Sequence, residues 1–197
     1  MTTEYTLPPL HSLVLRACHS TMESSRGFYY PLSGEVSAPD WEATAECGHG
    51  LHGWLWGEGL VRESGAEWAF SEENVKWLVL QVLTSSLIDL NGKVKFPSAT
   101  VVFVGDRKEA TDFIQKYAPS SVRAIIGAFV TTGERGTSTS GDGGTSTSGE
   151  KGTLCIKRYD RSSQRYRMET AYVGESGILP NTPYKLDENG KFVAVKV

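Results

Sequence analysis

Residues 133–156 consist of three consecutive eight-residue units, GERGTSTS, GDGGTSTS and GEKGTLCI, without an insertion between them. Each unit has a Gly-x-x-Gly corner and a four-residue extended segment. Successive side chains of a strand point to opposite faces, so Thr137, Thr139, Thr145 and Thr147 fall on one face and the intervening serines on the other. A flexible Gly/Ser/Thr linker is the alternative. Because a linker needs no strict register, the pattern favours stacked coils of an octapeptide β-solenoid.

The third unit differs from the first two and closes the predicted stack. Leu154 and Ile156 replace serine there, which would add apolar burial. We expect the glycines at 136, 144 and 152 to occupy equivalent corners with positive φ. The end of a β-stack presents unpaired backbone groups to other chains. The sequence therefore predicts a homo-oligomer, with self-association through Thr137, Thr139, Thr145, Thr147, Leu154 and Ile156.

A capped helix precedes the repeat. Asp106 and Glu109 have the spacing of a capping box, and the next turns carry an apolar stripe that includes Phe113. Apolar runs at 99–104 and 124–130 flank this helix. Strand, helix and strand in this order predict a parallel βαβ unit, and hence a mixed α/β domain over residues 1–130.

Hairpin patterns follow the repeat. Alternating segments lie at 152–158 and 166–173, and Asn189-Gly190 is a strong hairpin turn between 184–186 and 192–195. We therefore predict an α+β chain with three parts: an α+β domain at 1–130, a β-solenoid at 133–156 and a β-hairpin cap at 157–197.

Composition limits the classes of partner and compartment. The 197 residues carry a net charge of −3 and no run of Lys and Arg, whereas a nucleic-acid-binding face would be basic. Three cysteines are few, and an odd number cannot all pair within one chain, which argues against a disulfide framework. We see no signal peptide in the first ten residues and no apolar run of membrane-spanning length. We expect a cytoplasmic protein that binds neither nucleic acid nor membrane.

The string Cys47-x-His49-x-x-His52 is the main cluster of soft ligands. Thiolate and imidazole suit zinc, and Cys18-His19 could complete four ligands, but the spacing matches no known zinc module. Cys47 with a histidine could also form a nucleophile and base. We favour the interpretation that Cys47 is a small core residue and that the histidines order a Gly-rich turn. The sequence thus predicts no metal, no cofactor and no catalytic residue.

Tryptophans follow this string and provide a second hypothesis. Trp54 and Trp56 could lie on one strand face and line a ligand pocket, although five tryptophans within residues 41–77 could equally form a core. The first hypothesis is a non-enzymatic structural or interaction module. The second is a ligand- or metal-binding domain or an enzyme centred on Cys47, His49, His52, Trp54 and Trp56.

The octad register, Gly-x-x-Gly-Thr-Ser-Thr-Ser followed by Gly-Glu-Lys-Gly-Thr, resembles a widespread family of uncharacterised bacterial and phage proteins. Its members carry variable numbers of octads of the Gly-Thr-Ala-Thr-Ala-Gly type. The resemblance covers most of the chain, at 27–28, 47–52, 93–96, 104–107, 172–175, 178–184 and 186–192. It implies an architecture but no chemistry.

The octad is also similar to that of ice-nucleation proteins. A surface that templates ice needs a long regular array of Thr-x-Thr rows, and this chain has two. We therefore expect no ice-templating activity.

Overall fold

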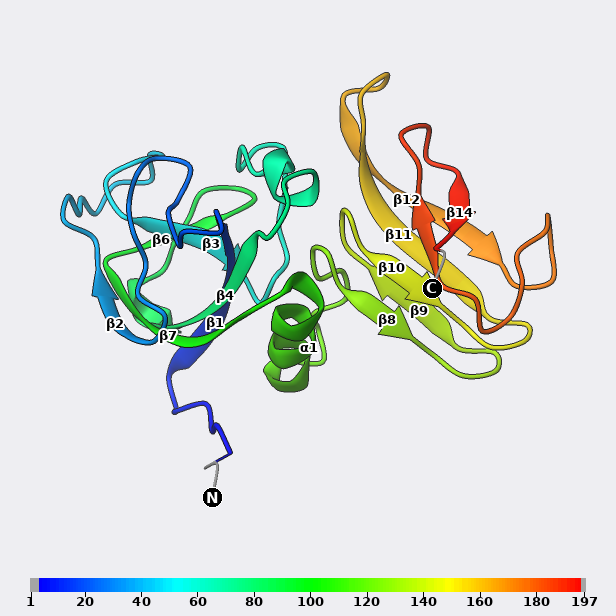
Figure 1. The fold of residues 1–197 in the computed structure, drawn as a ribbon, viewed down its shortest axis with the longest axis horizontal. Helices are drawn as coiled ribbons and strands as arrows, with labels where there is room; N and C mark the ends of the chain where they lie inside the picture. Colours follow the sequence, from blue (N-terminus) through cyan, green and yellow to red (C-terminus); the bar gives the residue numbers. More distant parts are fainter. Residues whose placement is uncertain (1–3, 196–197) are drawn as a thin grey trace. The chain divides into compact units, whose positions relative to one another are not determined.

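The computed structural model describes residues 4–195 and divides the chain into two compact units, Met1–Pro119 (unit 1) and Ser120–Val197 (unit 2). Residues 4–195 contain fourteen strands, one α-helix and two short 3-10 helices, η1 (Glu67–Phe70) and η2 (Thr84–Ser86) (Figure 1). The protein is therefore mostly β, and the predicted mixed α/β domain followed by a solenoid is wrong. Within the described range, no helix is long and apolar enough to cross a bilayer.

Unit 1 is built on one seven-stranded sheet. Its strands, in spatial order, are β2 (Gly34–Ser37), β7 (Ser98–Gly105), β4 (Lys76–Leu83), β1 (His11–Cys18), β3 (Leu51–Leu55), β6 (Val94–Phe96) and β5 (Ile88–Asp89). Every neighbouring pair is antiparallel. A register shift between Val79 and Leu80 interrupts the β4–β7 ladder, and such a bulge bends a sheet.

The helix prediction is confirmed, but the parallel βαβ unit is not. Helix α1 spans Arg107–Tyr117, and Asp106 and Glu109 form both bonds of the capping box. The strand that precedes it, β7, has only antiparallel neighbours. The apolar run at 124–130 enters strand β8 (Phe129–Thr131) only at its end, in a different sheet of unit 2. An apolar run shows burial but not its partner, which is why the assignment failed.

Strand β1 is buried on both faces. Leu13 and Leu15 have no exposed surface and belong to the face that α1 covers through the stacking of Phe113 on Phe103. Val14 belongs to the opposite face, within the main apolar cluster of unit 1. Arg16 is two residues further along and therefore points to the same side as Val14.

Unit 2 contains two smaller sheets. One has four strands in the order β14 (Phe192–Ala194), β13 (Tyr184–Leu186), β10 (Thr145–Thr147) and β8. The other has three strands in the order β12 (Arg165–Tyr172), β11 (Thr153–Asp160) and β9 (Thr137–Ser140). The predicted hairpins are confirmed as β11–β12 and β13–β14.

The repeat segments do not form a solenoid of stacked octads. Consecutive octad strands are distributed between the two sheets, and the parallel pairs are β8 with β10 and β9 with β11. Thr153 pairs with Thr137 and Thr145 with Phe129, so partners lie sixteen residues, or two octads, apart. The remaining ladders of unit 2 are antiparallel. A period of eight residues in sequence therefore does not define which strands pair.

The alternation of threonine and serine does fit the structure. Ser138, Ser140, Ser146 and Ser148 are fully buried. Their hydroxyls have partners inside the unit: Ser138 Oγ donates to Val130 O at 2.8 Å, and Ser140 and Ser146 Oγ lie 3.1 Å apart. Small hydroxylated side chains therefore fill a thin interior without leaving buried groups unsatisfied.

The corner glycines serve a different purpose from the predicted one. Positive φ belongs to the preceding residues, Arg135, Gly143 and Lys151, and not to Gly136, Gly144 or Gly152. A Cβ at Gly144 would lie 2.6 Å from Ser140 Cβ and 2.9 Å from Ala128 O. Close approach to the buried serine, rather than backbone conformation, excludes a side chain there.

This contact yields a test. We expect Gly144→Ala to destabilise the chain by about 1–3 kcal/mol, because its Cβ would overpack the interior. Gly133→Ala is the matched control, since a Cβ there meets nothing within 4 Å, and its effect should stay within about 0.5 kcal/mol. Urea unfolding followed by circular dichroism measures both. Equal effects of the two variants would contradict the packing account.

Candidate functional site

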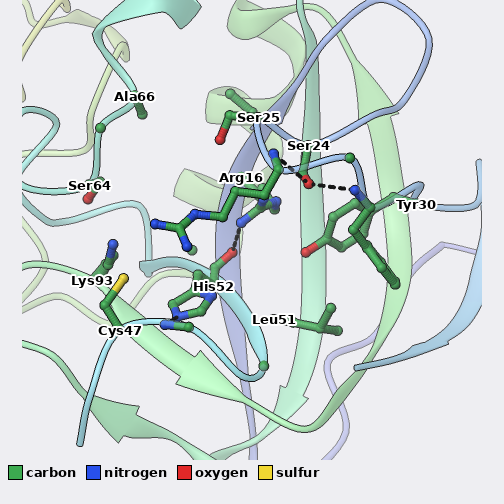
Figure 2. Close-up of a pocket in the computed structure, with 18 of the residues that line it drawn as sticks. Arg16, Ser24, Ser25, Tyr30, Cys47, Leu51, His52, Ser64, Ala66 and Lys93 are labelled. Atoms are coloured by element: carbon green, nitrogen blue, oxygen red, sulfur yellow. Dashed lines mark hydrogen bonds between the residues drawn. The ribbon is translucent and has the colours of Figure 1, made fainter. Parts of the chain in front are cut away.

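A cavity in unit 1 has a volume of about 630 Å³. Its wall combines the end of β1, the segment 24–30, the loop 47–50, strand β3, and residues 64–68. Figure 2 shows Arg16, Cys47, His52, Tyr30 and Lys93 around it. The cavity therefore lies where the Gly-rich string at 47–53 meets the central strand.

A buried lysine holds the loop that forms one wall. Lys95 on β6 has no exposed surface; its Nζ donates to Glu46 O at 2.9 Å and to Thr44 Oγ1 at 3.3 Å. The same ammonium lies 5.5 Å from the centroid of the Trp41 ring. A Cβ at Gly50 would lie 2.9 Å from both Lys95 Cγ and the Trp41 ring. Glycine is thus required at 50 by close packing.

His52 stabilises the same loop from the cavity side. Gly48 N–H donates to His52 Nε2 at 3.4 Å. Burial, together with the positive charges of Lys93, Arg16 and Lys95, lowers the pKa of His52 to about 4. The ring is therefore neutral at physiological pH, with its acceptor nitrogen engaged by the loop.

Arg16 brings a positive charge to the cavity. Its Nη1 donates to His52 O at 2.5 Å, and its guanidinium carbon lies 4.9 Å from the centroid of the Tyr30 ring. Its Nε is buried and has no hydrogen-bond partner among residues 4–195. The charged side chain of Arg16 thus reaches the cavity from strand β1, whose other central residues are apolar.

The structure brings four of the five residues of the second hypothesis to this cavity: Cys47, His49, His52 and Trp54. Trp54 is buried, stacks on Trp77 at 6.1 Å and donates from Nε1 to Ser64 Oγ at 3.0 Å. Trp56 lies past the end of β3 with a φ of 54° and does not line the cavity. Trp54 and Trp56 therefore do not share a strand face.

The cysteines and histidines considered as metal ligands differ in their exposure to solvent. Cys47 is exposed and Cys18 is buried. His49 is 57% exposed, with Nδ1 3.7 Å from Asp40 Oδ2. Within residues 4–195, no three His, Cys, Asp or Glu side chains are arranged to hold a metal ion.

The residues predicted for self-association occupy different environments in unit 2. Thr137 is exposed, and Thr139 and Thr147 are half-buried. Thr145 is buried, and Leu154 and Ile156 have essentially no exposed surface. Leu154 belongs to an apolar cluster of unit 2, and Thr137 and Thr139 lie on the edge strand β9.

Sequence reasoning missed the cations and one ring of the cavity: Arg16, Arg26, Lys93 and Trp68. The available signal was the single charge of Arg16 at the end of an apolar strand, where a partner or a ligand is expected. The other residues come from loops that the fold alone brings together.

The neutral state of His52 makes stability depend on pH. An unfolded histidine titrates near 6.5, so between pH 6.5 and 4 the unfolded chain takes up a proton that folded His52 excludes. The contribution of neutral His52 to the free energy of unfolding is therefore lost as pH falls through this window. We expect a loss of about 1–2 kcal/mol, which is less than the full pKa shift implies because solvent reaches part of the ring. We expect His52→Asn to show a shallower loss of stability than wild type over this range.

Urea unfolding at pH 7, 6, 5 and 4 measures this dependence. His49→Asn, a change of an exposed histidine in the same loop, is the control and should retain the wild-type slope. Identical slopes for wild type and His52→Asn would contradict the neutral state of this half-buried ring.

Comparisons with known proteins show two relationships. Ice nucleation proteins match this chain at 35% identity over 109 residues in Xanthomonas campestris pv. translucens, at 38% over 105 in Pseudomonas syringae and at 40% over 104 in Pseudomonas fluorescens. The matches cover 54%, 52% and 52% of this chain but 7%, 9% and 8% of those relatives. The chain thus spans less than a tenth of their length. No solved structure matches significantly.

A family model matches residues 12–116, which lie within unit 1 and include most of the cavity wall. This match covers more than half of the 197 residues. The chain therefore belongs to the family described as "Domain of unknown function (DUF7666)".

Proposed function

We propose that this chain is a non-enzymatic structural or interaction module that self-associates through the first strand of its repeat. The similarity to ice nucleation proteins supports a structural role, because nucleating ice is a physical process that requires no covalent chemistry. The chain covers only a small part of those relatives and has two Thr-x-Thr-bearing TSTS segments. Ice nucleation itself is therefore not proposed.

The open edge of β9 carries the proposal. This strand pairs with β11 and has no neighbour on its other side within residues 4–195. Thr153 N–H donates to Gly136 O at 2.9 Å. In a parallel ladder with this register, the N–H and C=O groups of Thr137 and Thr139 point away from β11. An edge with unpaired backbone groups is a template for another strand.

The edge strand lacks the residue types that most often block pairing. Strand β9 reads TSTS, without lysine or proline. Two copies related by a twofold axis could place Ser138 opposite Ser138 of the second copy. Thr137 of each copy would then exchange two backbone hydrogen bonds with Thr139 of the other. Such an interface closes on itself, so a dimer is the expected product.

A proline at the edge tests this proposal. Thr139→Pro removes an N–H that points away from β11, so the ladder inside the unit should survive. In sedimentation velocity with the full chain, we expect a concentration-dependent dimer for wild type and a monomer for Thr139→Pro, with little change in Tm at low concentration.

Thr139→Val is the matched control, since it keeps the backbone N–H and should keep the dimer. A wild type that stays monomeric up to about 0.1 mM, where an interface with a Kd of this order would show, would refute the proposal. A Thr139→Pro variant that is folded and fully dimeric would also refute it.

A further inference from the structure

Unpaired positive charge gathers around the cavity of unit 1. Arg16, Arg26 and Lys93 line it, with Asp40 as the lining carboxylate. The ion pairs of the described residues include none of these three cations. Burial lowers the pKa of His52, and the positive charges of Lys93 and Arg16 nearby lower it further. A cavity with this charge balance favours an anion.

Two N–H donors in the same wall lack an acceptor. Arg16 Nε and Trp68 Nε1 are the buried side-chain nitrogens without a hydrogen-bond partner among residues 4–195, and both residues line the cavity. A buried donor left without an acceptor destabilises the fold. These two donors, one of which belongs to the lining cation Arg16, indicate together with Arg26 and Lys93 a ligand that brings acceptor oxygens.

Aromatic rings form another part of the wall. Phe28 and Trp68 line the cavity and are only partly buried. Trp68 is held in place by stacking on His19 at 4.3 Å, and Phe28 by edge contact with Tyr30 at 5.1 Å. The volume of about 630 Å³ lies within the range of small-molecule sites and leaves room for more than an inorganic anion.

We propose that this cavity binds a small phosphorylated molecule with a planar ring, of the chemical class of a nucleotide. Arg16, Arg26 and Lys93 contact the phosphate oxygens, with Arg16 Nε and Trp68 Nε1 as donors. The planar ring packs on the exposed surface of Phe28 or Trp68. Binding here involves unit 1 alone, so it is independent of association through β9.

Isothermal titration calorimetry of the full chain with ADP, inorganic phosphate and adenosine tests the proposal. We expect ADP to bind at least about tenfold more tightly than either fragment, since it engages both the cations and the rings. Raising the salt concentration should weaken ADP binding, because ions screen the exposed cations.

Charge-removing variants assign the site. Arg26→Gln and Lys93→Gln should each weaken ADP binding about three- to tenfold, whereas Lys76→Gln, a cation of unit 1 outside the cavity, should leave it unchanged. Trp68→Phe keeps a ring but removes the N–H, and should weaken binding by about tenfold. Thermal melting without ligand verifies that each variant is folded.

Three results would overturn the proposal. The first is no measurable heat with millimolar ADP. The second is equal affinity for ADP and inorganic phosphate, since the ring would then contribute nothing. The third is unchanged ADP affinity in a folded Arg26→Gln/Lys93→Gln double variant. None of these results depends on whether the chain is a dimer.

Discussion

The close approach of strand β3 to the central strand β1 is the constraint on which unit 1 depends. A Cβ at Gly53 would lie 2.4 Å from Val14 Cγ1 and 2.7 Å from Leu15 O. Glycine at this position allows Leu15 to pair with Trp54 and brings His52 O within reach of Arg16. The same contact therefore builds the sheet and places a guanidinium in the cavity.

Next to this contact, hydrogen bonds hold the string at 47–53 as a wall of the cavity. The buried ammonium of Lys95 satisfies the carbonyl of Glu46, and His52 accepts from Gly48 N–H. Buried charges are tolerated where such partners are fixed in place. The histidine and the glycines, which in sequence could be metal ligands or catalytic groups, have clear structural partners. The cations that line the cavity, in contrast, form no ion pair among the described residues.

Unit 2 solves the problem of a small core by filling its interior with serine. The four buried serines leave room for strands from alternate octads to pack closely. Glycines at the corners are required because the side chain four residues earlier occupies the space of a Cβ, as Ser148 does at Gly152. Larger apolar residues appear where the hairpins cover the repeat, as with Leu154 beside Tyr184. Strand β9 remains an edge because, among residues 4–195, it pairs with β11 alone.

Local patterns were sufficient for the elements of this protein. The capping box of Asp106, the turn at Asn189-Gly190 and the alternation of threonine with serine depend on neighbours in the chain, and each was identified correctly. Local patterns could not predict which strands pair with one another. The octad period is compatible with partners eight or sixteen residues apart, and only packing between the two sheets of unit 2 selects sixteen.

The same division applies to the candidate site. The Cys47–Trp54 string was recognisable because glycine, histidine and tryptophan are unusual neighbours. The cations and Trp68 were not, since they come from segments up to 77 positions apart (16 and 93) that meet only in the folded sheet. Side-chain chemistry can be inferred from local sequence, but unpaired charge and unsatisfied donors are defined by what lies around them. Those surroundings exist only once β1, β3 and the loops have packed together.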